Sequence, residues 1–318
     1  MIYGVLAQPH SGGQTESAMS TISAALLPFA AAFLFPTTQA SSGAQDAGTM
    51  DVVETQDDRH DRLTVPVHIG KHGPYQFIID TGAQNTVLSS TLASDLDLPA
   101  GKQALLIGVA GQMHVDTVEI DEMLLGKRSF FGLLAPLLDR RHIGADGIVG
   151  IDSLQDQRVL LDFRRQLIAI DDAKALGGNK GFEIVVKARR RSGQLIMTRA
   201  MIDGVRTNVV IDTGAEVTIG NLALKRALAR RVENRETTIN SVTGQKLATN
   251  IGIARQLSFG HLKIRNVAIA YADAPPFRAL ELDDRPALLL GMRELRTFKR
   301  VAIDFASQSV LFDVPDDL

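Results

Sequence analysis

The sequence predicts a mainly β protein made of two similar lobes, related by internal duplication, with a cleft between them. Three observations support this fold class. Most segments are short, rich in β-branched residues and bounded by turn residues. Helical patterns are few. The same landmarks also occur twice in the same order, most clearly as YQFIIDTGAQNTVLSS around Asp80 and TNVVIDTGAEVTIGN around Asp212.

Each copy opens with a strand, a tight turn and a second strand that ends at the aspartate. The opening strands and turns are residues 65–69 with 70–73, and residues 195–202 with 203–204. A turn of small residues follows at nearly the same distance after each aspartate, as GVAGQ (108–112) and SVTGQ (241–245). These turns predict two equivalent β-hairpins, one in each copy.

The later elements repeat as well. A further hairpin, an apolar run ending in glycine and a closing motif follow in both copies, at residues 124–127, 146–154 and 158–163, and at residues 257–261, 287–295 and 300–305. One short helix is expected in each copy, over residues 150–157 and 291–298, with a further helical segment at 221–231 in the second. Asp162 and Asp304 in the closing motifs lack the Thr-Gly turn, so we expect them to be structural.

Composition excludes several classes of function. The 318 residues include 34 basic and 36 acidic side chains, a formal net charge of −2, which argues against nucleic acid as a partner. The basic clusters at Lys187–Arg191 and Lys225–Arg231 are expected to be solvated surface. Cysteine is absent, which excludes disulfides and thiolate chemistry. The seven histidines have no metal-ligand spacing, so neither a metal nor another cofactor is expected.

The chain is expected to divide into three parts: residues 1–58, an N-terminal lobe at 59–176 and a C-terminal lobe at 177–318. Residues 22–35 are apolar and uncharged, and small residues follow at 38–40, as in a signal peptide. The run is too short to span a membrane as a helix. No basic residue precedes it, however. We expect export to the periplasm or the medium, with a cytoplasmic location as the alternative.

The Asp-Thr-Gly-Ala motif predicts catalysis only when two copies of it lie together. An apolar strand delivers a carboxylate to its end, the glycine permits a tight turn, and the threonine hydroxyl can bond to a neighbouring loop. Two such loops face to face place Asp80 and Asp212 against one water molecule. Because like charges that close cannot both ionise, the pair shares a proton. One carboxyl can then take a proton from water while the other donates to a carbonyl oxygen, which is an arrangement that hydrolyses peptide bonds.

On these residues the chain resembles the aspartic proteases, and the DTGA-x-x-T-V-L form of its first loop is similar to the retropepsin-like branch. The resemblance covers residues 63–314 and implies two acid-protease lobes with the active-site cleft between them. It implies that Asp80 and Asp212 are catalytic and that the loops around them give support, through Thr81, Gly82, Ala83, Thr213, Gly214 and Ala215. It also implies that substrate-binding flaps carry Ala110, Gly111, Thr243 and Gly244. One chain holds both halves, like a covalent dimer of bacterial retropepsin-like units, so a monomer is sufficient for one active site.

Two departures from the pepsin-like pattern bear on function. Ala83 and Ala215 stand where pepsin-like enzymes have Ser or Thr, which removes a hydroxyl donor that would favour the ionised carboxylate. We therefore expect activity at mildly acidic to near-neutral pH. Neither flap contains a tyrosine, so substrate contacts there should be made largely through the backbone.

The expected function is thus an aspartic endopeptidase with a polypeptide substrate and no stable membrane span in its mature chain. Two alternatives remain open at this point. The chain could retain the fold as a catalytically silent peptide-binding or scaffolding protein, or it could be a protease that assembles into a larger oligomer. An assay for hydrolysis of an unfolded protein distinguishes an active protease from the silent binding protein. Sizing chromatography distinguishes a monomer from a larger oligomer.

Overall fold

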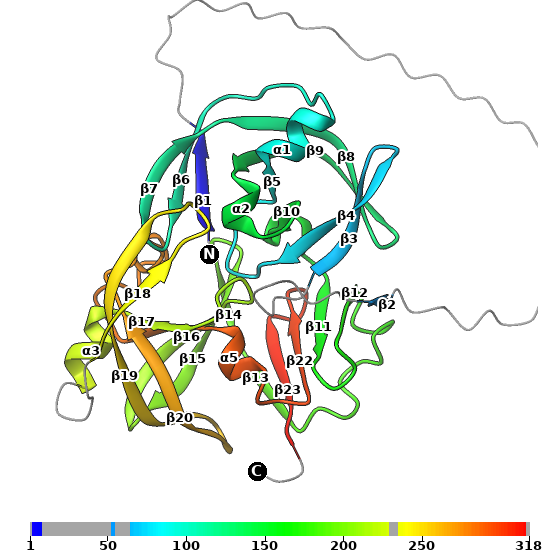
Figure 1. The fold of residues 1–318 in the computed structure, drawn as a ribbon. Coiled ribbons are helices and arrows are strands. Elements are labelled where there is room, and N and C mark those ends of the chain that lie inside the picture. The colour runs from blue at the N-terminus through cyan, green and yellow to red at the C-terminus, as the bar shows by residue number, and fades with distance from the viewer. Residues whose placement is uncertain (1, 8–51, 55–63, 229–234, 316–318) are drawn as a thin grey trace, which may run out of the picture. The chain divides into compact units, whose positions relative to one another are not determined.

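The computed structural model describes residues 2–7, 52–54, 64–228 and 235–315, which all belong to one compact unit. These residues form mainly β-strands, as Figure 1 shows, which confirms the predicted fold class. The apolar run at 22–35 lies outside the described residues. Among the described residues, no helix is long and apolar enough to cross a membrane.

A six-stranded closed barrel forms the core of the N-terminal lobe, with its strands in the order β10-β4-β3-β8-β9-β5. Their bounds are β3 Thr64–Ile69, β4 His72–Ile79, β5 Val87–Ser89, β8 Thr117–Leu125, β9 Arg128–Leu138 and β10 Gly147–Val149. Strand β4 runs parallel to β10, with residues 77–79 opposite residues 147–149. The strand that leads to Asp80 is therefore held at its end by the apolar run that the sequence repeats.

An eight-stranded sheet forms the C-terminal lobe, in the order β14-β15-β16-β21-β17-β20-β19-β18, and β15 also pairs with β19. The bounds are β14 Arg189–Arg191, β15 Gln194–Ile202, β16 Val205–Ile211, β17 Thr218–Gly220, β18 Arg235–Asn240, β19 Lys246–Phe259, β20 Leu262–Tyr271 and β21 Ala287–Leu290. Strand β16, which leads to Asp212, runs parallel to β21 over residues 208–211 and 287–290. This relation repeats that of β4 and β10, which confirms the duplication.

A third sheet takes strands from both lobes, in the order β13-β23-β22-β11-β12-β2. Its strands are β2 Val52–Glu54, β11 Arg158–Asp162, β12 Leu167–Asp171, β13 Ile184–Lys187, β22 Arg300–Asp304 and β23 Ser309–Asp313. The two repeated closing motifs, β11 and β22, pair antiparallel at its centre. Their apolar side chains belong to one core cluster that extends through both lobes. The predicted lobe boundary at residues 176 and 177 falls between β12 and β13.

A small antiparallel sheet, β1-β6-β7, contains the first of the predicted turns. Its strands are β1 Ile2–Ala7, β6 Ala104–Gly108 and β7 Gly111–Val115. Strand β1 comes from the segment that sequence patterning assigned to a leader and linker, yet it pairs along the whole of β6, from Ala7 opposite Ala104 to Ile2 opposite Gly108. Strand β2 also lies within that segment.

The helices are short. They are α1 Ser90–Asp95, α2 Arg140–Ile143, α3 Leu222–Leu228, α4 Pro275–Ala279 and α5 Met292–Leu295, with a 3₁₀ turn at Ile151–Ser153. The turn and α5 occupy the places where one helix per copy was predicted, but both are shorter than expected. Helix α3 begins one residue after the start of the predicted helical segment, whose last residues lie outside the described part of the chain.

Candidate active site

Asp80 and Asp212 lie at equivalent strand ends, directly after β4 and β16. The backbone N–H of Asp80 donates to Val149 at 3.1 Å, and that of Asp212 donates to Leu290 at 3.0 Å. The parallel neighbour of each strand thus fixes the start of each loop. Both aspartates are buried, with 1% and 0% of their surface exposed. The described structure therefore brings together the two carboxylates that the repeat predicted.

Thr81 and Thr213 join the two loops by reciprocal hydrogen bonds. The hydroxyl of Thr81 donates to the carbonyl of Ile211 at 3.0 Å, and that of Thr213 donates to the carbonyl of Ile79 at 2.7 Å. Each hydroxyl also accepts the backbone N–H of the other threonine, at 3.0 and 3.3 Å. All of these atoms are buried, where an unpaired polar group is costly, so the four bonds hold the loops in one relative position.

Gly82 and Gly214 allow the two loops to approach each other closely. A Cβ atom built on Gly82 would lie 2.6 Å from Oδ1 of Asp212, and one built on Gly214 would overlap Oδ2 of Asp80. Each glycine N–H also donates to Oδ1 of the aspartate in its own loop, at 2.7 Å for Gly82 and 3.1 Å for Gly214. Each glycine therefore orients the carboxylate of its own loop and leaves space for the carboxylate of the other loop.

The electrostatics of the pair favour one bound proton. Burial, followed by the charge of Asp80, raises the pKa of Asp212 to about 8. Oδ2 of Asp212 is buried and makes no hydrogen bond within the described part of the chain. A buried carboxyl with a raised pKa and an uncommitted oxygen can exchange a proton with a bound molecule near neutral pH.

A second pair of side chains supports the loops from behind, and sequence reasoning assigned it no role. The hydroxyl of Thr86 donates to Asp152 at 2.7 Å and accepts the N–H of Gly150 at 3.2 Å. In the other copy, Thr218 donates to Glu294 in the same way. Burial raises the pKa of both acids. The signal in the sequence is a threonine six residues after each aspartate, which in the first copy is the threonine of the DTGA-x-x-T-V-L form.

The predicted flap residues lie in two hairpin turns. Ala110 and Gly111 lie where β6 meets β7, and Thr243 and Gly244 lie between β18 and β19. The second turn is closed by its own bonds, since Ser241 and Gln245 pair through their backbones at 2.8 Å.

Each turn inserts a valine into the opposite lobe. Val109 belongs to an apolar cluster made mostly of C-terminal residues, among them Val210, which lies two residues before Asp212. Val242 belongs to a cluster made otherwise of N-terminal residues, including Ile78 and Ala83 on either side of Asp80. Both valines are buried, with 3% and 8% exposed. The two turns are thus anchored reciprocally, in the cores that carry the aspartates.

The turns also contact one another and α2. A Cβ atom on Gly111 would lie 3.2 Å from Oε1 of Gln245 in the other turn. Gly244 has a φ of +79°, and a Cβ atom there would overlap Cε1 of His142. Space at the second turn is therefore limited by α2 of the N-terminal lobe.

Within the described ranges, no group of three or more His, Asp or Glu side chains is placed to hold a metal ion. Asp80 and Asp212 are the ionisable side chains of the two Asp-Thr-Gly-Ala loops.

Comparison with known proteins relates the chain to a protein family and to solved structures. A family model described as aspartyl protease matches residues 65–153 and 198–293, one match in each lobe. A solved structure of a retropepsin-like aspartic protease from Rickettsia conorii is 20% identical, with a TM-score of 0.29, and the match covers 41% of this chain and 88% of that chain. No curated protein sequence matches the chain.

Proposed function

This chain belongs to the aspartyl protease family, and we propose that it is an endopeptidase in which Asp80 and Asp212 activate one water molecule for attack on a peptide bond. The observation that carries the proposal is the reciprocal threonine bonding, which joins two buried carboxylates from different lobes into one rigid unit. A structural aspartate at a turn would need no such partner from the other lobe.

In the proposed mechanism the pair starts with one proton. The ionised carboxylate takes a proton from water while the protonated one donates to the carbonyl oxygen of the substrate, and the tetrahedral intermediate then collapses as the leaving nitrogen is protonated. Oδ2 of Asp212 is the oxygen left to bind water, because Oδ1 already accepts the N–H of Gly214. Each step uses only water and the two carboxyl groups.

We propose that the substrate lies extended and pairs with the backbone of the flaps by strand addition. Support comes from β6, which already accepts β1 as an antiparallel strand, with Gly4 to Ala7 paired in register opposite Ile107 to Ala104. Ala110, Gly111, Thr243 and Gly244 offer mainly backbone groups to a peptide. Specificity would then depend on side-chain pockets elsewhere along the extended chain.

The test is hydrolysis of a reduced, unfolded protein by the purified full chain, with cleavage sites mapped by mass spectrometry. We expect cleavage that is blocked by an inhibitor that mimics the tetrahedral intermediate, because such a group occupies the position of the water between the carboxyls. Tight binding of the same inhibitor without cleavage of any peptide would overturn the proposed protease activity. It would favour a catalytically silent peptide-binding protein instead.

The dependence of activity on pH is a second expected outcome. Activity needs one proton on the pair, so it should be lost as pH rises through about 8, where the pair releases the proton that it shares. It should also fall in strong acid, where both carboxyls are protonated. The measurement is kcat/KM against pH with a neutral peptide. A single optimum below about pH 3, the range of an Asp with an ordinary pKa, would contradict the expectation.

Loosening the flaps should weaken substrate binding. We expect Val109→Ala with Val242→Ala to raise KM about fivefold or more, because each substitution removes about 1 kcal/mol of buried apolar contact that holds a flap against the opposite lobe. The matched control is Val185→Ala, since Val185 is 44% exposed on β13. If the double variant has unchanged KM and kcat, the contacts of Val109 and Val242 do not contribute to substrate binding, and the prediction is wrong.

We also propose that the protein is exported and that its N-terminal segment is removed after Ala40. Removal there would take β1 with it, since β1 precedes that site, and would leave the edge of β6 free for a peptide. N-terminal sequencing of the protein from fractionated cells should then find Ser41 first in the exported fraction. Recovery of only the full chain from the cytoplasm would contradict export.

A further inference from the structure

Strand β1 lies on the edge of β6 that β7 leaves open, and β6 is the strand that leads into the first flap turn. The register runs from Ala7 opposite Ala104 to Ile2 opposite Gly108, with one irregularity between Ile2 and Gly4. In Figure 1, β1 is the dark blue strand beside β6. The order β1-β6-β7 leaves β6 with a strand on both of its edges. The chain itself therefore occupies the open edge of the first flap.

The repeat shows that β1 is an addition to the flap. In the C-terminal copy, β18 leads into the equivalent turn and pairs antiparallel with β19, as β6 pairs with β7. β18 is the last strand of its sheet, and among the strands that the structure describes none pairs with its other edge. One copy thus forms its flap hairpin without a strand like β1. We infer that the repeated architecture does not require β1.

β1 lies where the first flap meets the C-terminal lobe. Helix α4 contacts both β1 and β6. Phe277 of α4 shares an apolar cluster with Ile107 of β6 and Val109 of the flap turn. Val210, two residues before Asp212, belongs to the same cluster. Since the other edge of β6 is taken by β7, a peptide that adds a strand to this flap would have to take the place of β1.

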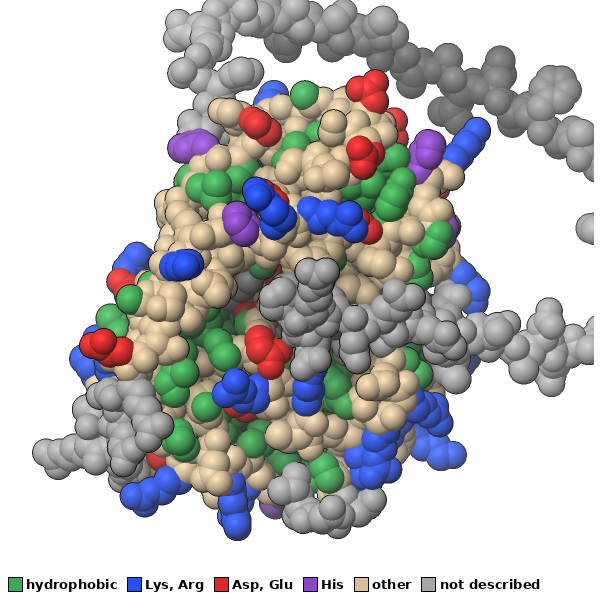
Figure 2. Space-filling model, in the orientation of Figure 1, with side chains coloured by type: hydrophobic (Ala, Val, Ile, Leu, Met, Phe, Trp, Pro, Cys, Tyr) green, Lys and Arg blue, Asp and Glu red, His purple; other side chains and the backbone are tan. Residues whose placement is uncertain are grey.

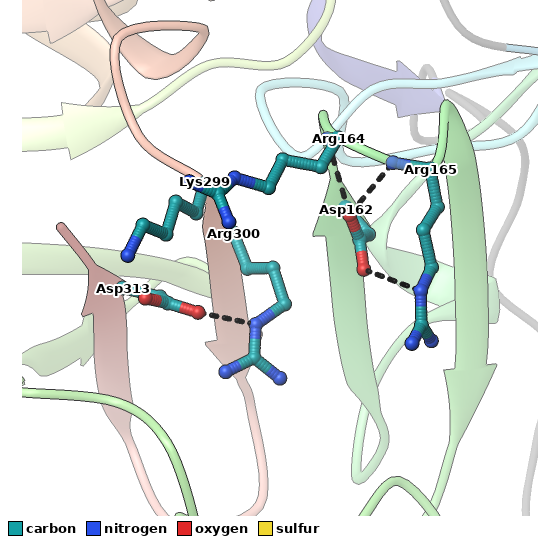
Figure 3. A pocket seen from close by; sticks show the side chains of 6 residues that line it. All are labelled: Asp162, Arg164, Arg165, Lys299, Arg300 and Asp313. Carbon is teal, nitrogen blue, oxygen red and sulfur yellow. Dashed lines mark hydrogen bonds and ion pairs between the residues drawn. The ribbon is translucent and has the colours of Figure 1, made fainter. Parts of the chain in front are cut away.

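The sequence of β6 favours an uncharged strand as its partner. It reads ALLIG, and all five residues are buried or half-buried. β1 reads IYGVLA and is uncharged as well. Lys and Arg side chains gather instead over the lower part of the face in Figure 2, and Asp162 and Asp313 form ion pairs at one end of the shared sheet (Figure 3). A charged side chain beside β6 would lose water in contact with apolar neighbours, which is costly.

We propose that β1 competes with the substrate: it occupies the edge of β6 as an extended, uncharged strand, and a peptide of the same kind binds there only when β1 leaves. This proposal rests on the proposed endopeptidase function. Antiparallel pairing offers the same backbone hydrogen bonds to either occupant. β1 pairs with β6 alone, so it can leave without opening another sheet. Removal of residues 1–40 on export, as proposed above, would free the edge of β6 permanently.

The test variant is Val5→Pro with Leu6→Pro in the full chain. Successive N–H groups of a strand point to opposite sides, so two adjacent prolines remove a donor to β6 whichever side faces it. If β1 occupies β6 in about nine chains of ten, the variant should bind a capped, uncharged peptide that contains statine about tenfold more tightly than the parent chain. Isothermal titration calorimetry measures this affinity. In peptide hydrolysis, KM should fall by the same factor and kcat should stay unchanged.

The matched control is Val52→Pro with Val53→Pro in β2, another strand at the edge of its sheet, which pairs with β12 far along the chain from the flaps. It should bind the statine peptide like the parent chain. Hydrogen exchange of the parent chain tests the same competition without any substitution, also if the β1 variant does not fold. The bound peptide should speed exchange in β1 and leave β6 protected, because it takes over the pairing with β6.

The outcomes distinguish this competition from the peptidase activity. Tighter binding by the β1 variant without cleavage by either chain would support the competition and overturn the peptidase. Equal affinity of the two chains for the statine peptide would overturn the competition, whether or not they cleave peptides. The competition is also wrong if exchange in β1 stays unchanged while the peptide is bound.

Discussion

Replacing Asp80 or Asp212 by asparagine is expected to lower kcat/KM for polypeptide hydrolysis by at least about 10³-fold while the fold survives. An amide has the shape of a carboxylic acid and can still accept the glycine N–H at its oxygen. It cannot take a proton from water, however, so the shared acid–base function is lost. The measurement is hydrolysis by each purified variant, with circular dichroism to check the fold.

The pH dependence of stability gives this prediction a second readout. The amide introduced by Asp212→Asn would resemble the protonated carboxyl, whereas the wild-type chain must ionise Asp212 as pH rises. Because its pKa is raised from 3.8 to about 8 on folding, the folded wild-type chain retains a proton that the unfolded chain releases, and its stability falls as pH rises across that range. The Asp212→Asn variant should escape this loss, so its Tm should exceed that of the wild type at pH 8 by more than at pH 4.

Asp283 offers a control, since it is an exposed aspartate of the same lobe. Asp283→Asn should leave both the rate and the pH dependence of Tm unchanged. Full turnover by either Asp80→Asn or Asp212→Asn would contradict the shared dyad. So would a Tm of Asp212→Asn that follows pH in parallel with the wild type.

The centre of the site could be predicted because its geometry is local. An apolar strand followed by Asp-Thr-Gly determines where the carboxylate, hydroxyl and tight turn lie, and the repeat shows that there are two such units. The pairing of Thr81 with Thr213 follows once the units face each other. The duplication was equally clear, since strand, turn and glycine landmarks recur in order.

Contacts made far from the local sequence could not be predicted in this way. GVAGQ and SVTGQ indicate turns, but which lobe receives Val109 or Val242 depends on how the hairpins cross. Successive side chains of a strand point to opposite faces, so even adjacent residues join different apolar clusters. Leu106 belongs to the cluster around Ile78, and Ile107 belongs to the cluster around Val210. Likewise, nothing within residues 2–7 shows that they pair with a strand a hundred residues later. The closing motifs are recognisable as repeats in the sequence. Their pairing with each other depends on the tertiary structure, which the local sequence does not determine.

The second large effect is expected from Gly214→Ala. Its Cβ atom would overlap both Cγ and Oδ2 of Asp80, so the loops must separate. Overpacking of this kind costs about 1–3 kcal/mol of stability, and a displacement near 1 Å in a catalytic group costs about 10²-fold in rate. We therefore expect a lower Tm together with a fall in kcat/KM of about 10²-fold or more.

A double-mutant cycle identifies the cause. If the overlap with Asp80 destabilises the chain, adding Asp80→Ala should reduce the cost of Gly214→Ala in the free energy of unfolding, whereas adding Asp212→Ala should not. Gly204→Ala serves as the control, because Gly204 has a φ of +85° but nothing lies within 4 Å of its Cβ position. It should lower Tm through backbone strain and leave kcat/KM unchanged. Equal costs of Gly214→Ala in both aspartate backgrounds would mean that the glycine does not hold the loops at the separation the dyad requires.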